Sequence, residues 1–180
     1  MNKYTDCMID LETLSIRPNA VVLSISALGF NPFVQYENYT DCPNLHMLLD
    51  IDSQKDREID PFTVEWWNRQ DKNIIDKIFS SENRITVPEA LEKLTKFTWG
   101  CKRIWAQGTD MDISVLKNLY EWNGQSVPWY YGTFRDCRTV LDLAVTEESK
   151  TTHDSSEDII RQTKKLQEAL SKLKITKFVH

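Results

Sequence analysis

Two carboxylates with a single residue between them, Asp10 and Glu12, follow the first apolar stretch of the chain. Side chains two positions apart on an extended backbone point to the same side, so these carboxylates would lie close together where a strand ends. Three later residues could complete a site with them: Asp112, His153 and Asp158. Four carboxylates without a cysteine are typical ligands of hard cations such as Mg²⁺ or Mn²⁺, whereas zinc is disfavoured. The residue types therefore indicate a cation site.

The elements that must position these residues are predicted from apolar runs, capping residues and turn signals. We expect strands over residues 5–9, 20–30, 34–39, 103–106 and 130–134. Helices are expected to follow the N-caps Asp60 and Thr86, to open at Asp110, and to cover residues 73–79, 138–143 and 157–172. Residues 41–59 have no clear period, so we expect loops with room for one short element.

Three strands in succession, followed by alternating helices and strands, predict an α/β fold with a mixed five-stranded sheet flanked by helices. Consecutive strands joined by short turns must be antiparallel, while strands reached through helices should run parallel to the first. Sites in such sheets gather at the carboxyl ends of the parallel strands. If the strand over residues 103–106 lies beside the first strand, Asp112 would face Asp10 and Glu12.

Composition limits the class of protein. The 180 residues are 41% hydrophobic, so we expect residues 1–180 to form a single domain with one core. The net charge of −5 argues against a broad basic face for long stretches of nucleic acid, although a cleft for a few nucleotides is compatible with it. Four scattered cysteines favour reduced thiols. Without a membrane-length apolar run or a signal-peptide plan, we expect a soluble, cytoplasmic protein with no membrane partner.

Three short motifs occur in the order found in one family of nucleases. D-L-E-T, G-T-D-M-D and H-D-S-S-E-D, at residues 10–13, 108–112 and 153–158, resemble the three motifs of the DEDDh 3′→5′ exonucleases, which have a ribonuclease-H-like fold. E-W-W-N-R-Q and R-D-C-R-T, at residues 65–70 and 135–139, are similar to segments of a branch that contains phage exodeoxyribonuclease A and some bacterial exoribonucleases. The resemblance implies an exonuclease that releases nucleoside monophosphates from the 3′ end of single-stranded nucleic acid. The phage relatives favour DNA slightly, and the bacterial relatives point to RNA.

The same resemblance implies a role for each candidate residue. Four carboxylates would hold two divalent cations, and a histidine would be the general base: Asp10, Glu12, Asp112, Asp158 and His153. Two cations in one site assist an in-line displacement at phosphorus, and a histidine can accept a proton from water near neutral pH. The segment around Glu12 would meet the terminal nucleotide through Leu11, Thr13 and Leu14.

Two departures from the family pattern surround the site without removing a ligand. Met111 stands where an aromatic residue is common, and residues 155–157 stand between His153 and Asp158 where small or apolar residues are frequent. Both departures bear on substrate preference more than on catalysis.

Several residues admit two interpretations. Trp66 and Trp67 are adjacent on a predicted helix, about 100° apart, so one would pack into the core while the other could stack on a base. Gln70 could bind a base edge or cap its helix. Five cationic residues could contact phosphates, although each is more often a solvated surface charge: Arg17, Arg69, Lys72, Arg135 and Arg138.

Two other functions stay open at this point. A nucleic-acid-binding module that has lost catalysis would be expected to lack a carboxylate or the histidine, and none is missing. A metal-dependent phosphoesterase for small nucleotides would need the same ligands. Singly, Asp112 could be a first-turn acid, Asp158 a helix cap and His153 an exposed loop residue. Some family members are dimers, so a homodimer is compatible with the resemblance.

Overall fold

β1 (Asp6–Thr13) is the middle strand of the sheet in the computed structural model, which describes residues 4–144 and 152–178. The strand order is β3-β2-β1-β4-β5. The other strands are β2 (Val22–Phe30), β3 (Asn44–Leu48), β4 (Arg103–Ala106) and β5 (Phe134–Asp136). β1, β2 and β3 pair antiparallel, while β4 and β5 run parallel to β1. The predicted mixed five-stranded α/β sheet is confirmed.

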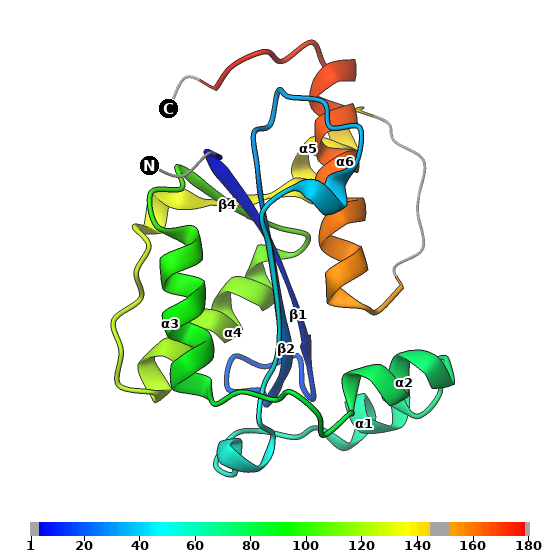
Figure 1. The fold of residues 1–180 in the computed structure, drawn as a ribbon, viewed down its shortest axis with the longest axis vertical. Helices are drawn as coiled ribbons and strands as arrows, with labels where there is room; N and C mark the ends of the chain where they lie inside the picture. Colours follow the sequence, from blue (N-terminus) through cyan, green and yellow to red (C-terminus); the bar gives the residue numbers. More distant parts are fainter. Residues whose placement is uncertain (1–3, 145–151, 179–180) are drawn as a thin grey trace.

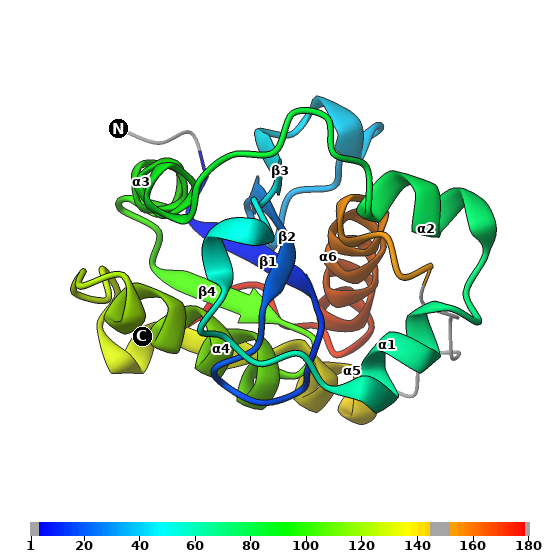
Figure 2. The same cartoon turned by 90° about the horizontal axis from the view of Figure 1, so that it is seen from below.

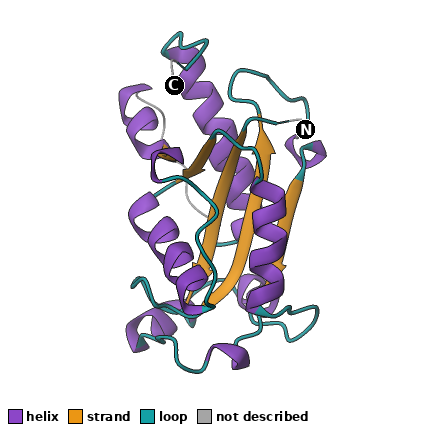
Figure 3. Cartoon of the chain, turned by 90° about the vertical axis from the view of Figure 1, so that its left-hand side faces the viewer, coloured by secondary structure: helices purple, strands orange, loops and turns teal. Residues whose placement is uncertain are grey.

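Helices cover both faces of this sheet (Figure 1). On one face, toward the viewer in Figure 3, lie α3 (Val87–Thr98) and α4 (Thr109–Trp122). On the other face lie α5 (Cys137–Ala144) and α6 (Ser155–Lys172). The short helices α1 (Pro61–Trp67) and α2 (Lys72–Ile78) lie beside the start of α6, at the end of the sheet (Figure 2). Single 3₁₀ turns occur at Tyr39–Asp41, Asp52–Gln54 and Tyr131–Thr133.

The two predicted N-caps are present. The side chain of Asp60 accepts a hydrogen bond from the N–H of Thr63 at the start of α1, and Thr86 accepts one from Glu89 at the start of α3. In both helices a proline follows within the first turn, where its missing N–H has no intrahelical partner to lose. Local sequence therefore determines where these helices begin.

Alternation along β1 decides on which face of the sheet the chemistry lies. Cys7, Ile9 and Leu11 point into the core formed with α3 and α4, whereas Met8 packs into the core beside α5 and α6. Because side chains two apart share a face, Asp10 and Glu12 continue the row that Met8 begins. The apolar row under α6 thus gives way to carboxylates toward the carboxyl end of β1.

The strand predicted over residues 34–39 is wrong. That segment is a loop leading into a 3₁₀ turn, and the third strand is β3, inside the segment expected to be mostly loop. The carbonyl of Val34 accepts a hydrogen bond from the amide of Gln167, so this loop is tied to α6 instead of to the sheet. β3 is an edge strand in which only Met47 is buried, and its apolar signal is correspondingly weak.

The fifth strand lies further along the chain than the predicted residues 130–134. A 3₁₀ turn precedes it, and β5 begins at Phe134. This position sets Asp136 opposite Ala106. The Asp136 carboxylate accepts hydrogen bonds from the N–H groups of Thr109 and Arg138, both at 2.9 Å. Asp136 therefore ties together the first turns of α4 and α5.

Asp6 joins β1 to β4 at the opposite end of the sheet. Its buried carboxylate accepts bonds from Arg103 Nε at 2.7 Å and Nη2 at 2.9 Å, and from Trp105 Nε1 at 2.7 Å. The four cysteines are free, and three of them are buried as small apolar side chains. Among the helices that the structure describes, none is both long and apolar enough to cross a membrane.

Candidate metal and catalytic site

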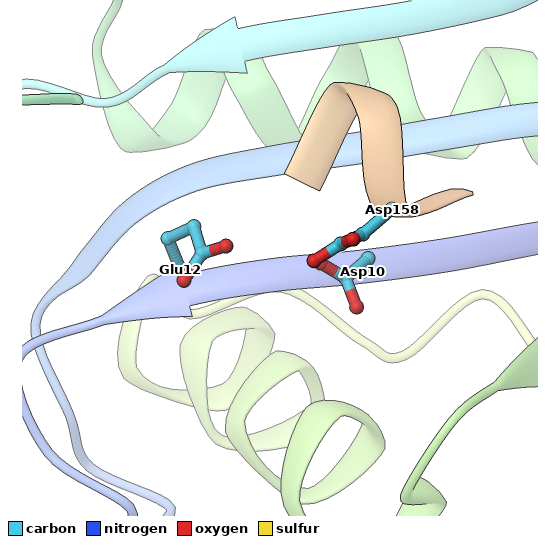
Figure 4. Close-up of side chains that lie close together, drawn as sticks. All are labelled: Asp10, Glu12 and Asp158. Carbon is cyan, nitrogen blue, oxygen red and sulfur yellow. The ribbon is translucent and has the colours of Figure 1, made fainter. Parts of the chain in front are cut away.

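Three of the predicted carboxylates meet at the end of β1. Asp10 and Glu12 project from the strand, and Asp158 reaches them from the first turn of α6 (Figure 4). One carboxylate oxygen from each lies within 4.8 Å of the other two. Glu12 and Asp158 are buried, while Asp10 is partly exposed. The two-residue spacing on β1 thus brings both carboxylates to one face, as predicted, and the packing of α6 adds the third.

The start of α6 is anchored from two sides. Asp154 is its N-cap, accepting from the N–H of Ser156, and it also pairs with Lys77 of α2. The hydroxyl of Ser155 is hydrogen-bonded to Ser24 at 2.9 Å and to Ser26 at 2.7 Å, both on β2. These contacts hold the first turn of the helix against the sheet, and Asp158 lies in that turn.

The carboxylates of the group repel one another in a poorly hydrated place. Burial raises the pKa of Asp10 to about 7, and the charge of Asp158 adds to the shift. Burial raises the pKa of Glu12 to about 9, with contributions from the charges of Asp10, Asp158 and Asp112. Without a cation, part of this group keeps its protons at neutral pH. A positive charge placed among these oxygens would relieve the repulsion.

Asp112 lies beside this group and not within it. It is buried in the first turn of α4, and β4 pairs directly with β1, which is the condition under which Asp112 was expected to face the pair. Burial raises its pKa well above the usual value, and the charge of Asp10 acts in the same direction. Asp112 and Asp10 line the same cavity, so each carboxylate lies in the field of the other.

His153 stands between the carboxylates and α1. Its ring is perpendicular to the ring of Trp66, with centroids 4.6 Å apart. The backbone N–H of His153 donates to Asp158 Oδ2 at 3.2 Å, and the backbone N–H of Thr152 donates to Asp158 Oδ1 at 3.1 Å. Burial lowers the pKa of His153 despite the nearby Asp158 charge. The imidazole is therefore neutral near pH 7.

An open cavity of about 950 Å³ contains all five predicted residues. Its walls also include four of the predicted substrate contacts, namely Leu11, Thr13, Trp66 and Trp67. Trp67 is buried and donates from Nε1 to the carbonyl of Thr13 at 2.9 Å, while Trp66 is 38% exposed. One tryptophan thus packs into the core and the other faces the cavity.

Two predicted substrate contacts lie elsewhere. Leu14 is buried in a core cluster with Trp67 and does not line the cavity. Gln70 donates from Nε2 to the carbonyl of Trp66 at 2.9 Å, so it provides a hydrogen-bond partner for a backbone carbonyl at the end of α1. Like Leu14, Gln70 does not line the cavity. The capping interpretation of Gln70 is the one that matches these contacts.

Several cavity residues were not singled out as site residues from the sequence. They include Ile16, Phe62, Gln107, Arg161 and Gln162, whereas Arg138, also in the wall, is one of the five cationic residues named above as possible phosphate contacts. Gln162 is buried and donates from Nε2 to Asp10 Oδ1 at 2.8 Å. It stands four residues after Asp158, and residues at this spacing share a helix face. The four-residue spacing from Asp158 could therefore have identified Gln162 from the sequence.

Comparison with known proteins decides the family. The 3′-5′ exoribonuclease Rv2179c-like domain matches residues 5–179, which is nearly the whole chain. The chain belongs to this family. It is accordingly a hydrolase, a 3′-5′ exonuclease of the DEDDh type.

Relatives of this exonuclease agree with the assignment. The exodeoxyribonuclease of Enterobacteria phage T4 is 22% identical over 171 residues, which cover 82% of this chain and 75% of the phage protein. The nuclease domain of 3′hExo, a DEDDh family member bound to rAMP, has a TM-score of 0.63 at 12% identity and covers 94% of this chain and 93% of that one. Pop2p of S. pombe, in a form with Mg²⁺ and Mn²⁺, has a TM-score of 0.63 at 11% identity, covering 98% and 86%. The expected ribonuclease-H-like fold is confirmed.

Ser155 lies in the third motif of this exonuclease, and its side chain is almost fully buried. A buried hydroxyl needs partners, and Ser24 and Ser26 of β2 supply them. The serine of the third motif is therefore matched by polar residues on the strand beneath it.

Proposed function

We propose that this exonuclease removes nucleoside 5′-monophosphates, one at a time, from the 3′ end of single-stranded DNA or RNA, using two divalent cations and His153 as the general base. The observation that carries the proposal is the meeting of Asp10, Glu12 and Asp158 in an open cavity that also holds Asp112 and His153. An open cavity can admit the end of a chain, and the carboxylates mark the place of the scissile phosphate.

The residues present fit a hard divalent cation. All the donors are carboxylate oxygens, which Mg²⁺ and Mn²⁺ prefer, and burial together with mutual repulsion raises the pKa values of Asp10 and Glu12. Asp10, Glu12, Asp112 and Asp158 would together hold the cations. When bound, the cations would stabilise the charge that develops on the phosphate oxygens. The S. pombe relative with Mg²⁺ and Mn²⁺ supports this choice of ions.

His153 is placed to accept the proton of the attacking water. It lines the cavity next to Asp158, and its lowered pKa keeps the imidazole neutral. As the water oxygen bonds to phosphorus, its proton passes to His153 and the bond from phosphorus to the 3′ oxygen of the penultimate nucleotide breaks. The products are a nucleoside 5′-monophosphate and a chain one nucleotide shorter with a free 3′-hydroxyl.

The aromatic wall of the cavity supports a single-stranded substrate. Trp66 is partly exposed in the wall, and Phe62 from the same helix is 80% exposed. Stacking on such rings stabilises a bound base by about 1–3 kcal/mol and requires that the base leave its own stack. A frayed or single-stranded 3′ end meets this requirement most easily.

Both sugars belong to the proposal. The matched family is described as an exoribonuclease, and the neighbouring 3′hExo domain was solved with rAMP, which support RNA. The phage T4 relative is an exodeoxyribonuclease, which supports DNA. A contact to the 2′-hydroxyl would separate the two sugars, and direct comparison of matched substrates measures it.

The test uses matched 5′-labelled single-stranded RNA and DNA with Mg²⁺ or Mn²⁺, resolved on a denaturing gel. We expect a ladder that shortens from the 3′ end, is abolished by a chelator, and is lost in Asp112→Asn. Glu89→Gln is the control, because it removes a first-turn acid from α3, where Glu89 pairs with Lys93. Intact label with both substrates, in wild-type protein and Asp112→Asn alike, would overturn the proposal.

The same assay separates the other two candidate functions. A silent binding module would retain oligonucleotides without shortening them, and the presence of all four carboxylates and His153 gives it no support. A phosphoesterase for small nucleotides would hydrolyse a mononucleotide model ester and leave oligomers intact.

A further inference from the structure

Two arginines line the cavity, and their guanidinium groups have different surroundings. Arg161 bonds to Asp158 Oδ1 through Nε at 3.1 Å and Nη2 at 3.0 Å. Arg138 is exposed, and within residues 4–144 and 152–178 its guanidinium makes no hydrogen bond or ion pair. The donors of Arg138 are therefore available to a ligand that enters the cavity.

The position of Arg138 is set by its neighbours. Its N–H donates to Asp136, which also accepts from the first turn of α4. Gly108, immediately before α4, has a φ of 118°, and because it has no Cβ, a neighbouring side chain can approach its Cα closely. A Cβ at this position would stand 3.1 Å from Nη1 of Arg138. The guanidinium thus lies against the backbone at Gly108, where a larger residue would crowd it.

Arg138 stands on the Asp112 side of the site. Its guanidinium lies against Gly108, the residue immediately before α4, and the first turn of α4 carries Asp112. Within residues 4–144 and 152–178 Arg138 makes no ion pair with Asp10, Glu12 or Asp158, whereas Arg161 pairs with Asp158. Arg138 is therefore displaced from the group of three carboxylates, where the scissile phosphate would be held.

The chemistry of a 3′ end restricts which phosphate a displaced arginine can meet. The terminal nucleoside ends in a hydroxyl, so no phosphate lies beyond it. The scissile phosphate joins this nucleoside to the penultimate one, and the next phosphate lies on the 5′ side of the penultimate nucleoside. A positively charged side chain in the cavity that does not bind the scissile phosphate can therefore bind only this upstream phosphate within the last three nucleotides.

We propose that Arg138 forms a separate subsite for the phosphate between the penultimate and third nucleotides from the 3′ end. The inference rests on the proposed function. A guanidinium presents paired N–H donors that match two phosphate oxygens, which gives strong, charge-assisted bonds. A backbone phosphate is present in every base sequence and in both DNA and RNA. The subsite therefore orients the bound chain without distinguishing its bases or its sugar. The enzyme therefore requires three nucleotides for full activity.

The experiment compares a trinucleotide, which has the scissile and the upstream phosphate, with a dinucleotide, which has the scissile phosphate alone. In Arg138→Gln we expect kcat/KM for the trinucleotide to fall about 10- to 100-fold, the range for loss of a hydrogen bond to a charged group, with no change for the dinucleotide. Replacing the upstream phosphate by a neutral methylphosphonate should cause the same loss in wild-type protein and none in Arg138→Gln.

Two variants serve as controls. Lys96→Gln removes one positive charge from an exposed position on α3 that does not line the cavity, and it should leave turnover of the trinucleotide unchanged. Arg138→Lys keeps the charge and loses the paired donors, so it should fall between wild type and Arg138→Gln. The methylphosphonate comparison needs no variant, so it decides the matter even if Arg138→Gln does not fold.

The outcomes separate this inference from the proposed function. Equal losses on both substrates in Arg138→Gln, or full activity of the methylphosphonate trinucleotide in wild-type protein, would overturn the upstream subsite alone. Absence of turnover of every substrate by wild-type protein would refute the proposed function, and the subsite with it.

Discussion

Gln162 couples α6 to the first carboxylate of β1. Its side chain is buried, Nε2 donates to Asp10, and Oε1 has no partner among the described residues. A buried amide oxygen without a partner has an energetic cost, and such exceptions are often found at functional sites. By donating to one oxygen of Asp10, Gln162 restrains the orientation of this carboxylate. We therefore regard it as a positioning residue.

Gln162→Leu should weaken cation binding with little effect on the fold. Loss of a residue that orients a metal ligand typically costs roughly 10- to 100-fold in metal affinity or activity. Titration of the protein with Mn²⁺ by calorimetry measures the affinity without any substrate.

Gln167→Leu is the matched control on the same helix. Gln167 is equally buried, but its amide bonds to the carbonyls of Asn31 and Val34, far from the carboxylates. Its replacement should lower the free energy of unfolding and leave Mn²⁺ affinity unchanged. Equal Mn²⁺ affinities of Gln162→Leu and wild type would contradict the positioning role.

α6 is the element that completes the site, because its first turn carries Asp158 and the preceding loop carries His153. That turn is held by the N-cap Asp154, by the pair between Asp154 and Lys77, and by the bonds of Ser155 to β2. Loss of the cap would let the first turn fray, which would move the Asp158 carboxylate away from Asp10 and Glu12. The same loss in a helix remote from the cavity would affect stability only.

Asp154→Ala and Thr86→Ala therefore form a pair of tests. Each removes an N-cap, which lowers the free energy of unfolding by about 1 kcal/mol. At a temperature where both variants are folded, Asp154→Ala should lose exonuclease activity and Thr86→Ala should retain it. Denaturant unfolding and the labelled-oligonucleotide assay provide the two measurements. Equal activities would show that the first turn of α6 does not depend on its cap.

Buried carboxylates at the two ends of β1 differ in how their charge is compensated, and this difference affects the stability of the whole molecule. At its beginning Asp6 is buried with Arg103, so its charge is compensated within the fold. At its end, Asp10 and Glu12 are gathered with Asp158, and the proposed cations would compensate their charge. Under this proposal the metal-free protein carries a destabilising group that metal binding relieves.

The metal-free protein should lose stability as pH rises. Asp10 and Glu12 have folded-state pKa values of about 7 and 9, above the ordinary values of 3.8 and 4.5. For each residue, at a pH between its ordinary pKa and its raised pKa, the folded state holds a proton that the unfolded chain has lost. The free energy of unfolding therefore falls as pH rises through this range. The slope is roughly 1.4 kcal/mol per pH unit for each extra proton held.

Thermal or denaturant unfolding between pH 5 and 8, with a chelator or with excess Mn²⁺, measures this effect. The decline should be present with the chelator and absent with Mn²⁺, because bound cations keep the carboxylates ionised. Glu12→Gln removes the acid with the highest pKa of the two, so the slope in chelator should become shallower. A chelator profile that is flat, or that rises with pH, would refute the prediction.

Much of the site could be predicted from residue types and spacing, because the relevant signals are local. The two-residue step from Asp10 to Glu12 determines a shared face, and the caps Asp60 and Thr86 determine where two helices begin. The order of strands and helices was enough to predict that β4 runs parallel to β1, and the condition that β4 lies beside β1, under which Asp112 would face the pair, is met. Each of these inferences concerns neighbours in the chain or a rule of chain connection.

The remaining features depend on packing between distant segments. β3 was missed because an exposed edge strand has a weak apolar pattern, and residues 34–39 were assigned to the sheet because their contacts with α6 are invisible in the sequence. The bonds of Ser155 to β2 and the approach of Arg138 to Gly108 join residues far apart in the chain or on different helices. Only the tertiary structure decides such contacts, since they arise from how whole elements pack and not from the periodicity of any one of them.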